Sequence, residues 1–200
     1  MLITSIAPLD QRRSKIFLEE NFILVLYQGE LRRYHLEVGS ELTPEDYREI
    51  LETILCKRAR ERALYLMKYS DKTEREIRRK LKDGFYPEEA IDRAVAFLKE
   101  YRYIDDESYA TRYIECYGSK KSRRQMYYDL QQKGLPRELV ESLLQASPVD
   151  EETQIIRFLQ KKDYDMEHTN QKDRSKLVAS LARKGFAFDT IRKVMQEAFS

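Results

Sequence analysis

The chain has 200 residues, enough to bury a hydrophobic core as one domain or two small ones. Hydrophobic residues make up 42% of it and aromatic residues 11%, which excludes a disordered chain although 36% of the residues are charged. The net charge of +2 is unevenly distributed. Residues 1–56 hold six Lys/Arg and ten Asp/Glu, whereas residues 57–200 hold 31 and 25, a balance that permits a nucleic-acid partner without requiring one.

The chemistry of the rare residues excludes several classes of protein. Cys56 and Cys116 are the only cysteines, and the chain shows no signal peptide and no long apolar run. We therefore expect a cytoplasmic protein with reduced thiols and no membrane contact. His35 and His168 stand alone in the sequence, so we expect no metal and no cofactor.

The first part of the chain carries the strand signals. Short apolar and β-branched segments occur at residues 2–6, 15–18 and 22–27, and Glu20-Asn21 fits a hairpin turn between the last two. Tyr27, Leu31 and Tyr34 then follow at helical spacing, up to Gly39. We predict a small β-meander within an N-terminal extension, residues 1–42, that is separable from the rest.

Helical patterns dominate from residue 43 onward. Thr43 followed by Pro44 and two acids is typical of a helix start, and we expect that helix to end near Glu52. A longer helix should run to Tyr69, and Ser70 or Asp71 should cap the next one. Residues 43–104 are thus expected to hold a first three-helix repeat with a preceding helix.

One pattern occurs three times at even spacing. It consists of two apolar residues four apart, a glycine, and then a second apolar helix. The glycines are Gly84, Gly134 and Gly185, which are 50 and 51 residues apart, although copy one is one residue shorter between its leucine and its glycine. Such periods are typical of stacked helical units. We predict a mainly α fold in which tandem three-helix repeats, the second at 105–147 and the third at 148–200, form an elongated curved stack.

Two features lie within these repeats. Tyr109, Tyr113 and Tyr117 form a stripe that could stack nucleobases, but Ala110 and Ile114 share its face, so we expect it to face a neighbouring helix. In the third repeat we expect a helix over residues 151–160 and a loop or frayed helix over 161–173.

Catalytic patterns are absent from the sequence. No Gly-rich phosphate loop, nucleophile arrangement or metal-binding cluster occurs, and the paired acids stand at helix starts, where capping explains them. We therefore expect that the chain is not an enzyme.

The basic residues are the remaining candidates for a binding site, and they fall on the equivalent helix of each repeat. They are Arg75, Arg78 and Arg79 in the first repeat, Lys120, Lys121, Arg123, Arg124 and Lys133 in the second, and Lys176, Arg183 and Lys184 in the third. A solvated helix face explains the first set well, because Glu74 can pair with Arg78 at i,i+4. The second set has only Asp129 against five bases. We expect it to form an open anion site at a helix start, with no stabilising role.

The motifs resemble those of the bacterial RecX family. The resemblance rests on Ser70-x3-Glu74-x2-Ile77-x3-Leu81 with Gly84-Phe85, on Tyr103-Ile104-Asp105-Asp106-x2-Tyr109-Ala110, and on Lys133-Gly134-Leu135, and it covers about residues 50–200. Ser122 stands where the family often has Gly. The resemblance implies a curved stack of three-helix repeats that binds the recombinase RecA and lies in the groove of its filament on single-stranded DNA. It further implies inhibition of ATP hydrolysis, strand exchange and filament growth, without catalysis.

Two other functions fit parts of the pattern. Each glycine-turned helix pair could belong to a stand-alone DNA-binding module of helix-turn-helix type, but acids such as Glu88 and Glu138 on the second helices would repel phosphate. A structural adaptor without nucleic-acid contact is the third possibility. We expect a monomer whose partner is the RecA filament, with direct contact to single-stranded DNA left open.

Overall fold

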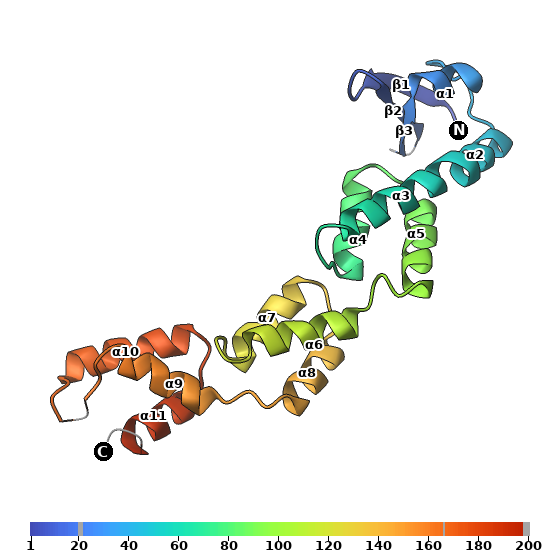
Figure 1. Ribbon diagram of the computed structural model, residues 1–200. Coiled ribbons are helices and arrows are strands. Elements are labelled where there is room, and N and C mark those ends of the chain that lie inside the picture. Colours follow the sequence, from blue (N-terminus) through green and yellow to red (C-terminus); the bar gives the residue numbers. More distant parts are fainter. Residues whose placement is uncertain (20–21, 166, 198–200) are drawn as a thin grey trace. The chain divides into compact units, whose positions relative to one another are not determined.

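The computed structural model describes residues 1–19, 22–165 and 167–197 (Figure 1). The chain divides into two compact units, one up to Asp105 and the other from Asp106 onward. Helices make up most of the described chain, and a three-stranded sheet precedes them, as predicted. No helix in the described part is both long enough and apolar enough to cross a membrane.

The sheet is an antiparallel meander in chain order, which confirms the prediction. Its strands are β1 (Ile3–Pro8), β2 (Arg13–Leu18) and β3 (Ile23–Tyr27). Ile16 pairs with Leu24, and both side chains are fully buried. The expected hairpin dipeptide Glu20-Asn21 lies outside the described residues. A short helix, α1 (Gln28–Arg33), follows β3 directly.

The next helical stretch is longer than expected. Thr43 caps α2 (Pro44–Ile50) by accepting a 3.1 Å hydrogen bond from the Asp46 N–H, as predicted. The predicted end near Glu52 is wrong, because a π-helical segment, η2 (Leu51–Leu55), joins α2 to α3 (Cys56–Met67) without a break. The buried residues Leu51, Leu55, Ala59 and Ala63 recur every four residues. The wider π turn at Leu51–Leu55 offsets part of the drift that a four-residue period accumulates on an α-helix of 3.6 residues per turn.

Two further helices complete the first repeat, α4 (Glu74–Asp83) and α5 (Glu88–Glu100). The N-cap of α4 is Thr73, and not Ser70 or Asp71 as predicted. Thr73 is fully buried, and it forms a capping box in which its hydroxyl accepts from the Glu76 N–H and the Glu76 carboxylate accepts from the Thr73 N–H. The reciprocal pair satisfies two backbone donors at the helix start.

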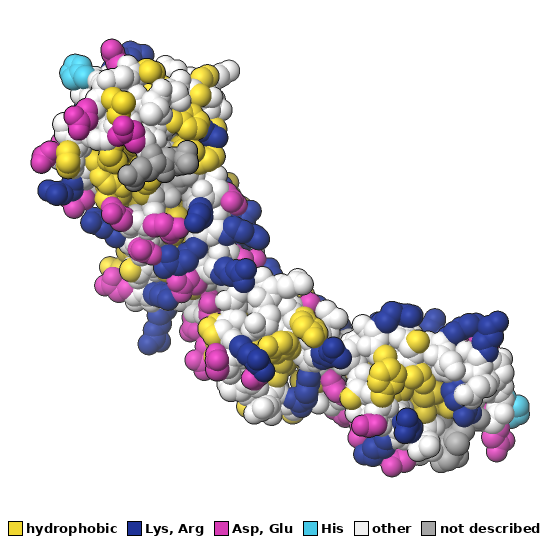
Figure 2. All heavy atoms as spheres, turned by 180° about the vertical axis from the view of Figure 1, so that it is seen from behind, with side chains coloured by type: hydrophobic (Ala, Val, Ile, Leu, Met, Phe, Trp, Pro, Cys, Tyr) yellow, Lys and Arg dark blue, Asp and Glu magenta, His cyan; other side chains and the backbone are white. Residues whose placement is uncertain are grey.

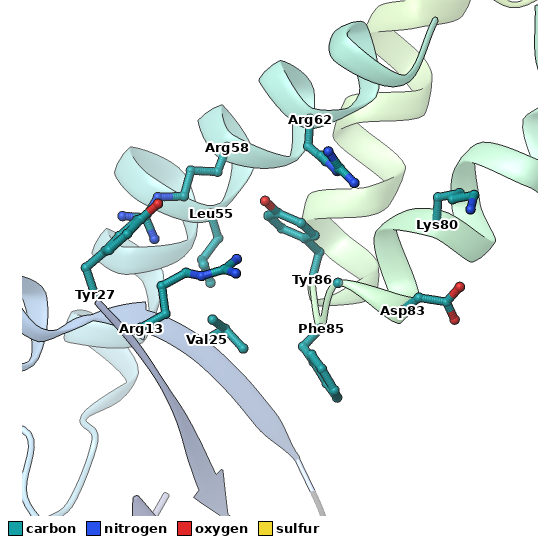
Figure 3. Close-up of a pocket in the computed structure, with 11 residues that line it drawn as sticks. Arg13, Val25, Tyr27, Leu55, Arg58, Arg62, Lys80, Asp83, Phe85 and Tyr86 are labelled. Carbon is teal, nitrogen blue, oxygen red and sulfur yellow. The ribbon is translucent and has the colours of Figure 1, made fainter. Parts of the chain in front are cut away.

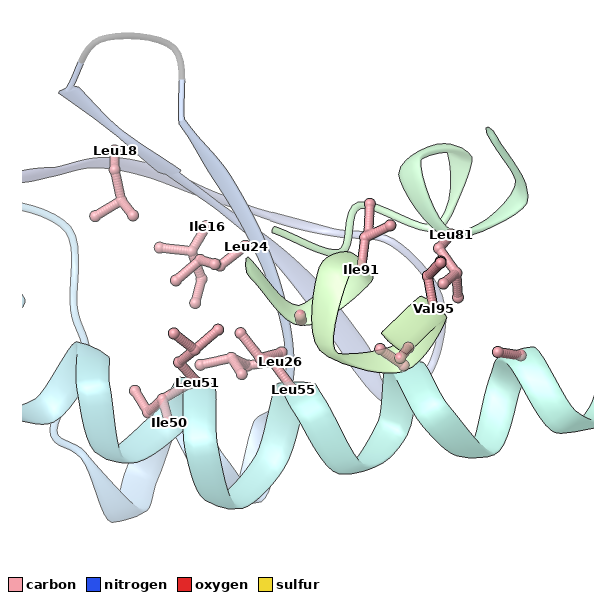
Figure 4. Close-up of a cluster of buried hydrophobic side chains, with 14 of the residues drawn as sticks. Ile16, Leu18, Leu24, Leu26, Ile50, Leu51, Leu55, Leu81, Ile91 and Val95 are labelled. Carbon is pink, nitrogen blue, oxygen red and sulfur yellow. The ribbon is translucent and has the colours of Figure 1, made fainter. Parts of the chain in front are cut away.

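The sheet and the first repeat share one hydrophobic core. Ile16, Leu24 and Leu26 point from the sheet toward Leu51 and Leu55 (Figure 4). The same cluster continues to Ile77, Leu81 and Ile91 in α4 and α5. This common core argues against a separable extension at residues 1–42, because removing the sheet would expose the apolar side of α2 and η2 to water.

The second unit contains two repeats, each with its own hydrophobic cluster. The second repeat consists of α6 (Asp106–Tyr117), α7 (Arg123–Gln132) and α8 (Arg137–Ala146). The third consists of α9 (Glu151–Gln160), α10 (Gln171–Arg183) and α11 (Phe188–Glu197). The helix expected over 151–160 is confirmed. The expected loop is shorter than predicted, because Asn170 caps α10 by accepting a 2.9 Å hydrogen bond from the Asp173 N–H; Met166 in that loop lies outside the described residues.

The turn between the last two helices is the same in all three repeats, and it corrects the glycine alignment. The residue with positive φ is Gly134 (91°) in the second repeat, Gly185 (90°) in the third, and Phe85 (61°) in the first. Each stands four residues after a fully buried leucine: Leu130, Leu181 and Leu81. Copy one is therefore not shortened. Its structural counterpart of the glycine is Phe85, and Gly84 lies one position earlier with a negative φ.

Candidate functional site

The start of α7 is built around a buried serine. The Ser122 side chain is 1% exposed, and its hydroxyl accepts a 3.2 Å hydrogen bond from the Gln125 N–H. The Arg123 N–H donates to the Glu151 carboxylate at 2.7 Å. Two of the backbone donors at this helix start are thus already bonded within the protein. The expectation of an open anion site formed by free N–H groups is wrong for this reason.

Arg123 uses its guanidinium to hold the end of the second repeat. The group donates to the carbonyl oxygens of Leu144, Ser147 (3.0 Å) and Val149 (3.1 Å). These carbonyls lie at and beyond the C-terminus of α8, where helical partners are lacking. Arg123 is therefore a structural residue, which corrects the expectation that it has no stabilising role.

Lys121 is also held by its own repeat. Its Nζ donates to the Asp129 carboxylate and to the Tyr113 hydroxyl, each at 2.8 Å. These two bonds, that of Asp129 first, raise the pKa of Lys121. Tyr113 in turn donates to Asp129 at 2.7 Å, and its ring lies 4.6 Å from that of Tyr117.

The structure also shows which tyrosines of the predicted stripe face the core of the second repeat. Tyr109 and Tyr113 pack against the core of the second repeat, as predicted, whereas Tyr117 is 39% exposed beneath the Lys121 ammonium group.

The remaining bases of the second repeat differ in exposure. Lys120 and Arg124 are exposed, and the only hydrogen bond of the Arg124 guanidinium in the described structure is a long one of 3.5 Å to the Tyr128 hydroxyl. Lys133 is half-buried at the C-terminal cap of α7. Lys120 and Arg124 are thus the two exposed side chains of this set, and within the described residues neither forms an ion pair.

The third repeat places its bases next to this helix start. The Ser122 hydroxyl donates a 2.7 Å hydrogen bond to the Lys184 carbonyl, and a Cβ added to Gly185 would lie 3.3 Å from the Arg124 Cβ. The turn after α10 therefore sits directly on the first turn of α7. It brings the exposed Arg183 and Lys184 to the same region as Arg124. Lys176 lies apart from them on α10 and pairs with Asp173 at 2.8 Å.

We call the exposed bases at this junction the repeat 2–3 basic surface. They are Lys120, Arg124, Arg183 and Lys184. On the face shown in Figure 2, Lys and Arg side chains lie over both repeats of this unit.

Only some of the basic residues predicted as a binding site in the first repeat are exposed and, within the described residues, outside ion pairs. Arg78 pairs with Glu74 at 2.8 Å and with Asp92 at 2.6 Å, and these acids raise its pKa. Arg75 and Arg79 are exposed and lie four residues apart on one face of α4. The predicted pairing of Glu74 with Arg78 is confirmed. A basic track that continues from this repeat to the others stays a prediction.

The fold brings together three arginines that no pattern in the sequence marked as a group. Arg13, Arg58 and Arg62 line a cavity in the first unit. Arg58 and Arg62 are four apart on α3, which was a usable signal, but Arg13 comes from a strand 45 residues earlier than Arg58 in the chain. No group of three or more His, Cys, Asp or Glu side chains that could hold a metal ion occurs among the described residues.

Comparison with known proteins identifies the family. The model of the RecX first three-helix domain matches residues 59–98, and that of the RecX third three-helix domain matches residues 150–195. The regulatory protein RecX of Clostridium botulinum (strain Alaska E43 / Type E3) is 30% identical over 201 residues, covering 96% of this chain and 92% of that protein. The chain belongs to the RecX family. The regulatory protein RecX of Caldanaerobacter subterraneus subsp. tengcongensis is also 30% identical, over 98% of both chains.

Solved RecX structures share the fold. A crystal structure of regulatory protein RecX aligns with a TM-score of 0.63 at 22% identity, over 98% of this chain and 99% of that one. RecX from Lactobacillus salivarius aligns with a TM-score of 0.64 at 22% identity, over 72% of this chain and 97% of that one. The tandem three-helix architecture is thus shared with RecX proteins, and the relatives named above are regulatory proteins.

Proposed function

We propose that this chain binds the RecA recombinase and its filament on single-stranded DNA, and that it mainly inhibits ATP hydrolysis, strand exchange and filament growth. The observation that carries the proposal is the match to regulatory RecX proteins along almost the whole chain. The cellular setting would be DNA repair, recombination and the SOS response in the cytoplasm. The protein would act as a monomer.

The repeat 2–3 basic surface is the part of the chain that we assign to this contact. Four bases from two repeats gather where the turn after α10 meets the start of α7. Such a surface would meet DNA phosphate or acidic patches of the recombinase, and its contribution would fall with added salt. Arg75 and Arg79 would extend the contact from the first repeat, and Lys133 and Lys176 would lie at its margin.

Regulation by this protein would need no chemistry of its own. Binding that favours one state of the filament over another changes the filament's activity by population shift alone. The purified protein should therefore hydrolyse no ATP and cleave no DNA by itself. Turnover that copurifies with the protein would contradict this part of the proposal.

The decisive experiment compares three ligands: the RecA filament on single-stranded DNA, naked single-stranded DNA, and RecA without DNA. Wild type should bind the filament most tightly. The double substitution Lys120→Gln with Arg124→Gln should weaken filament binding by about 5- to 30-fold, which corresponds to roughly 0.5–1 kcal/mol for each contact. The slope of affinity against salt should also flatten, because fewer counterions are released.

A matched control removes the same charge elsewhere in the unit. Lys161→Gln with Lys162→Gln changes two exposed bases of the loop after α9 and should leave filament affinity within about twofold. Equal weakening by both pairs would mean that only net charge matters and would remove the assignment to the repeat 2–3 basic surface.

A stand-alone DNA-binding module of helix-turn-helix type is the alternative. It predicts that naked DNA binds as tightly as the filament. The acids of the turn-following helices weigh against it, since Glu88 and Asp92 are 63% and 62% exposed and would face phosphate in a groove. A structural adaptor would bind RecA regardless of DNA and would be insensitive to salt.

A further inference from the structure

A cavity of about 460 Å³ opens in the first unit. It lies between β2 and β3, the helix α3, and the turn that joins α4 to α5 (Figure 3). Val25 and Leu55 lie among the lining residues, and the other side chains around the opening are mostly basic or aromatic. Its volume falls in the range of pockets that hold small molecules, about 300–1,000 Å³.

The charges around this cavity are predominantly positive. Arg13 comes from β2, Arg58 and Arg62 from α3, and Lys80 from α4, against a single acid in the lining, Asp83. Two of these bases have acidic partners outside the lining: Arg58 pairs with Glu30, and Arg13 pairs with Asp10 at 2.7 Å.

Arg62 and Lys80 are exposed, and within the described residues neither forms an ion pair. Their positive charge is therefore available to an anionic ligand.

Aromatic side chains form another part of the cavity lining. Tyr27 is 40% exposed, and the Arg58 guanidinium lies 4.2 Å from the centre of its ring, so that the two form a stack at the rim. The Tyr86 side chain points into the cavity toward Arg62 and Arg13 (Figure 3). Burial raises the pKa of Tyr86, although the charges of Arg58, Arg62 and Arg13 act against the rise. The hydroxyl therefore stays protonated at neutral pH and can donate a hydrogen bond.

The backbone beside the cavity is strained. Phe85 has a φ of 61°, where the second and third repeats have glycine in the equivalent turn. A bulky residue in this conformation is uncommon, and the strain belongs to the helix-ending turn that all three repeats share. Here it fixes the Phe85 ring 3.9 Å from the Lys15 ammonium group and positions the next residue, Tyr86, in the cavity.

We propose that this cavity binds a nucleotide, with the phosphate held by Arg62 and Lys80 and the base stacked at the Tyr27–Arg58 rim. Exposed bases beside aromatic faces are the combination that recognises a phosphate joined to a planar ring. An acidic peptide would use the bases but would leave the rings without partners. The nucleotide can be free in solution or part of a single strand, and the proposal does not depend on the recombinase.

The test measures binding to the full-length protein by calorimetry. The probes are thymidine monophosphate, inorganic phosphate, a twelve-residue thymidine oligonucleotide, and a peptide of alternating Asp and Glu. The double substitution Arg62→Gln with Lys80→Gln should weaken nucleotide binding by about tenfold or more, since two charge-assisted contacts are lost. The control Lys57→Gln with Lys68→Gln removes two exposed charges on and beside α3, outside the cavity, and should change affinity by less than about twofold.

A second variant separates the ring from the phosphate. Tyr27→Leu keeps the apolar bulk but removes the stacking face, so it should weaken nucleotide binding by about fivefold or more and leave binding of inorganic phosphate unchanged. Circular dichroism establishes that each variant is folded.

The probes also identify the source of the ligand. Binding of the monophosphate supports a free nucleotide, whereas binding of the oligonucleotide alone, weakened by the same substitutions, supports a nucleotide within a strand. The proposal is overturned if both nucleotide probes are insensitive to Arg62→Gln with Lys80→Gln, or if the acidic peptide binds more tightly than either. All arms omit the recombinase, so failure here is distinct from failure of the regulatory function.

Discussion

A side chain at position 185 would collide with Ser122: a Cβ added to Gly185 would lie 2.6 Å from the Ser122 hydroxyl oxygen. The same hydroxyl caps α7 and donates to the Lys184 carbonyl, so one buried group fixes the second repeat against the third. The positive φ of Gly185 adds a second reason for glycine at this position. This contact is what brings Arg124 and Lys184 into one surface.

Gly185→Ala should destabilise the second unit by about 2–4 kcal/mol, from backbone strain together with the contact to Ser122. Urea denaturation followed by circular dichroism measures this loss. The control is the same substitution in a Ser122→Gly background, where the collision with the hydroxyl is absent. The cost should then be smaller by about 0.5–3 kcal/mol, and purely additive effects would contradict the proposed contact.

Arg123 and Arg124 are neighbours with opposite expected behaviour. Arg123→Gln removes the donors to three carbonyls at the end of α8 and should cost about 1.5–3 kcal/mol. Arg124→Gln changes an exposed side chain and should alter stability by less than about 0.5 kcal/mol. Thermal melts of the two variants test this difference. If the two variants are equally stable, the hydrogen bonds of the Arg123 guanidinium do not stabilise the repeat, and Arg123 behaves as an ordinary surface base.

Asp129 should make the second unit sensitive to acid. Burial raises its pKa, but hydrogen bonds from Lys121, Tyr113 and Gln125 outweigh burial and lower it overall. A lowered pKa means that the stabilisation is present above the unfolded value of about 3.9 and is lost as the pH falls through the folded value.

Asp129→Asn should therefore cost about 1–2 kcal/mol at pH 7, and the difference from wild type should shrink as the pH falls from 4 toward 2. Urea denaturation across this range is the measurement, with Glu115→Gln, an exposed acid on α6, as the control. A difference that does not depend on pH would show that the amide loses packing and not charge.

Phe85 offers a direct measure of backbone strain. Phe85→Ala and Phe85→Gly both remove the ring beside Lys15, but only glycine adopts a φ of 61° without strain. The Gly variant should therefore be more stable than the Ala variant by about 1 kcal/mol. An Ala variant as stable as the Gly variant would show that the turn relaxes once the ring is gone.

The hydrophobic periodicity of the sequence predicted the helix pairs and their buried residues correctly. Ile77, Leu81, Met126 and Leu130 are fully buried, as their four-residue spacing indicated, and the helix pairs follow from it. The site was predicted less well, because spacing along a helix does not reveal contacts between repeats. Glu151 and Lys184 lie far from Ser122 and Arg123 in the chain, yet they occupy the helix start that the sequence presented as open.

Two features that were predicted wrongly, the N-cap of α4 and the helix end near Glu52, had a signal in the sequence. Thr73 and Glu76 form a capping box three residues apart, and this pattern was present in the sequence. Leu51, Leu55, Ala59 and Ala63 continue one apolar spacing across the predicted helix end, which indicated a helix without a break.

The last prediction concerns the sheet, which the sequence presented as separable because its charge balance and hydrophobic period differ from those of the helices. Ile16, Leu24 and Leu26 are fully buried in the cluster that also holds Leu55. Deleting residues 1–42 should therefore leave the first repeat unable to unfold cooperatively, with loss of helicity beyond that of the deleted segment. In the full chain, Leu24→Ala should cost about 2–5 kcal/mol, whereas Leu9→Ala, at a site 36% exposed, should cost less than about 0.5 kcal/mol. Circular dichroism and urea denaturation measure all three variants; a truncated chain that keeps a cooperative transition for the first repeat at the wild-type midpoint would show that the sheet is an independent extension after all.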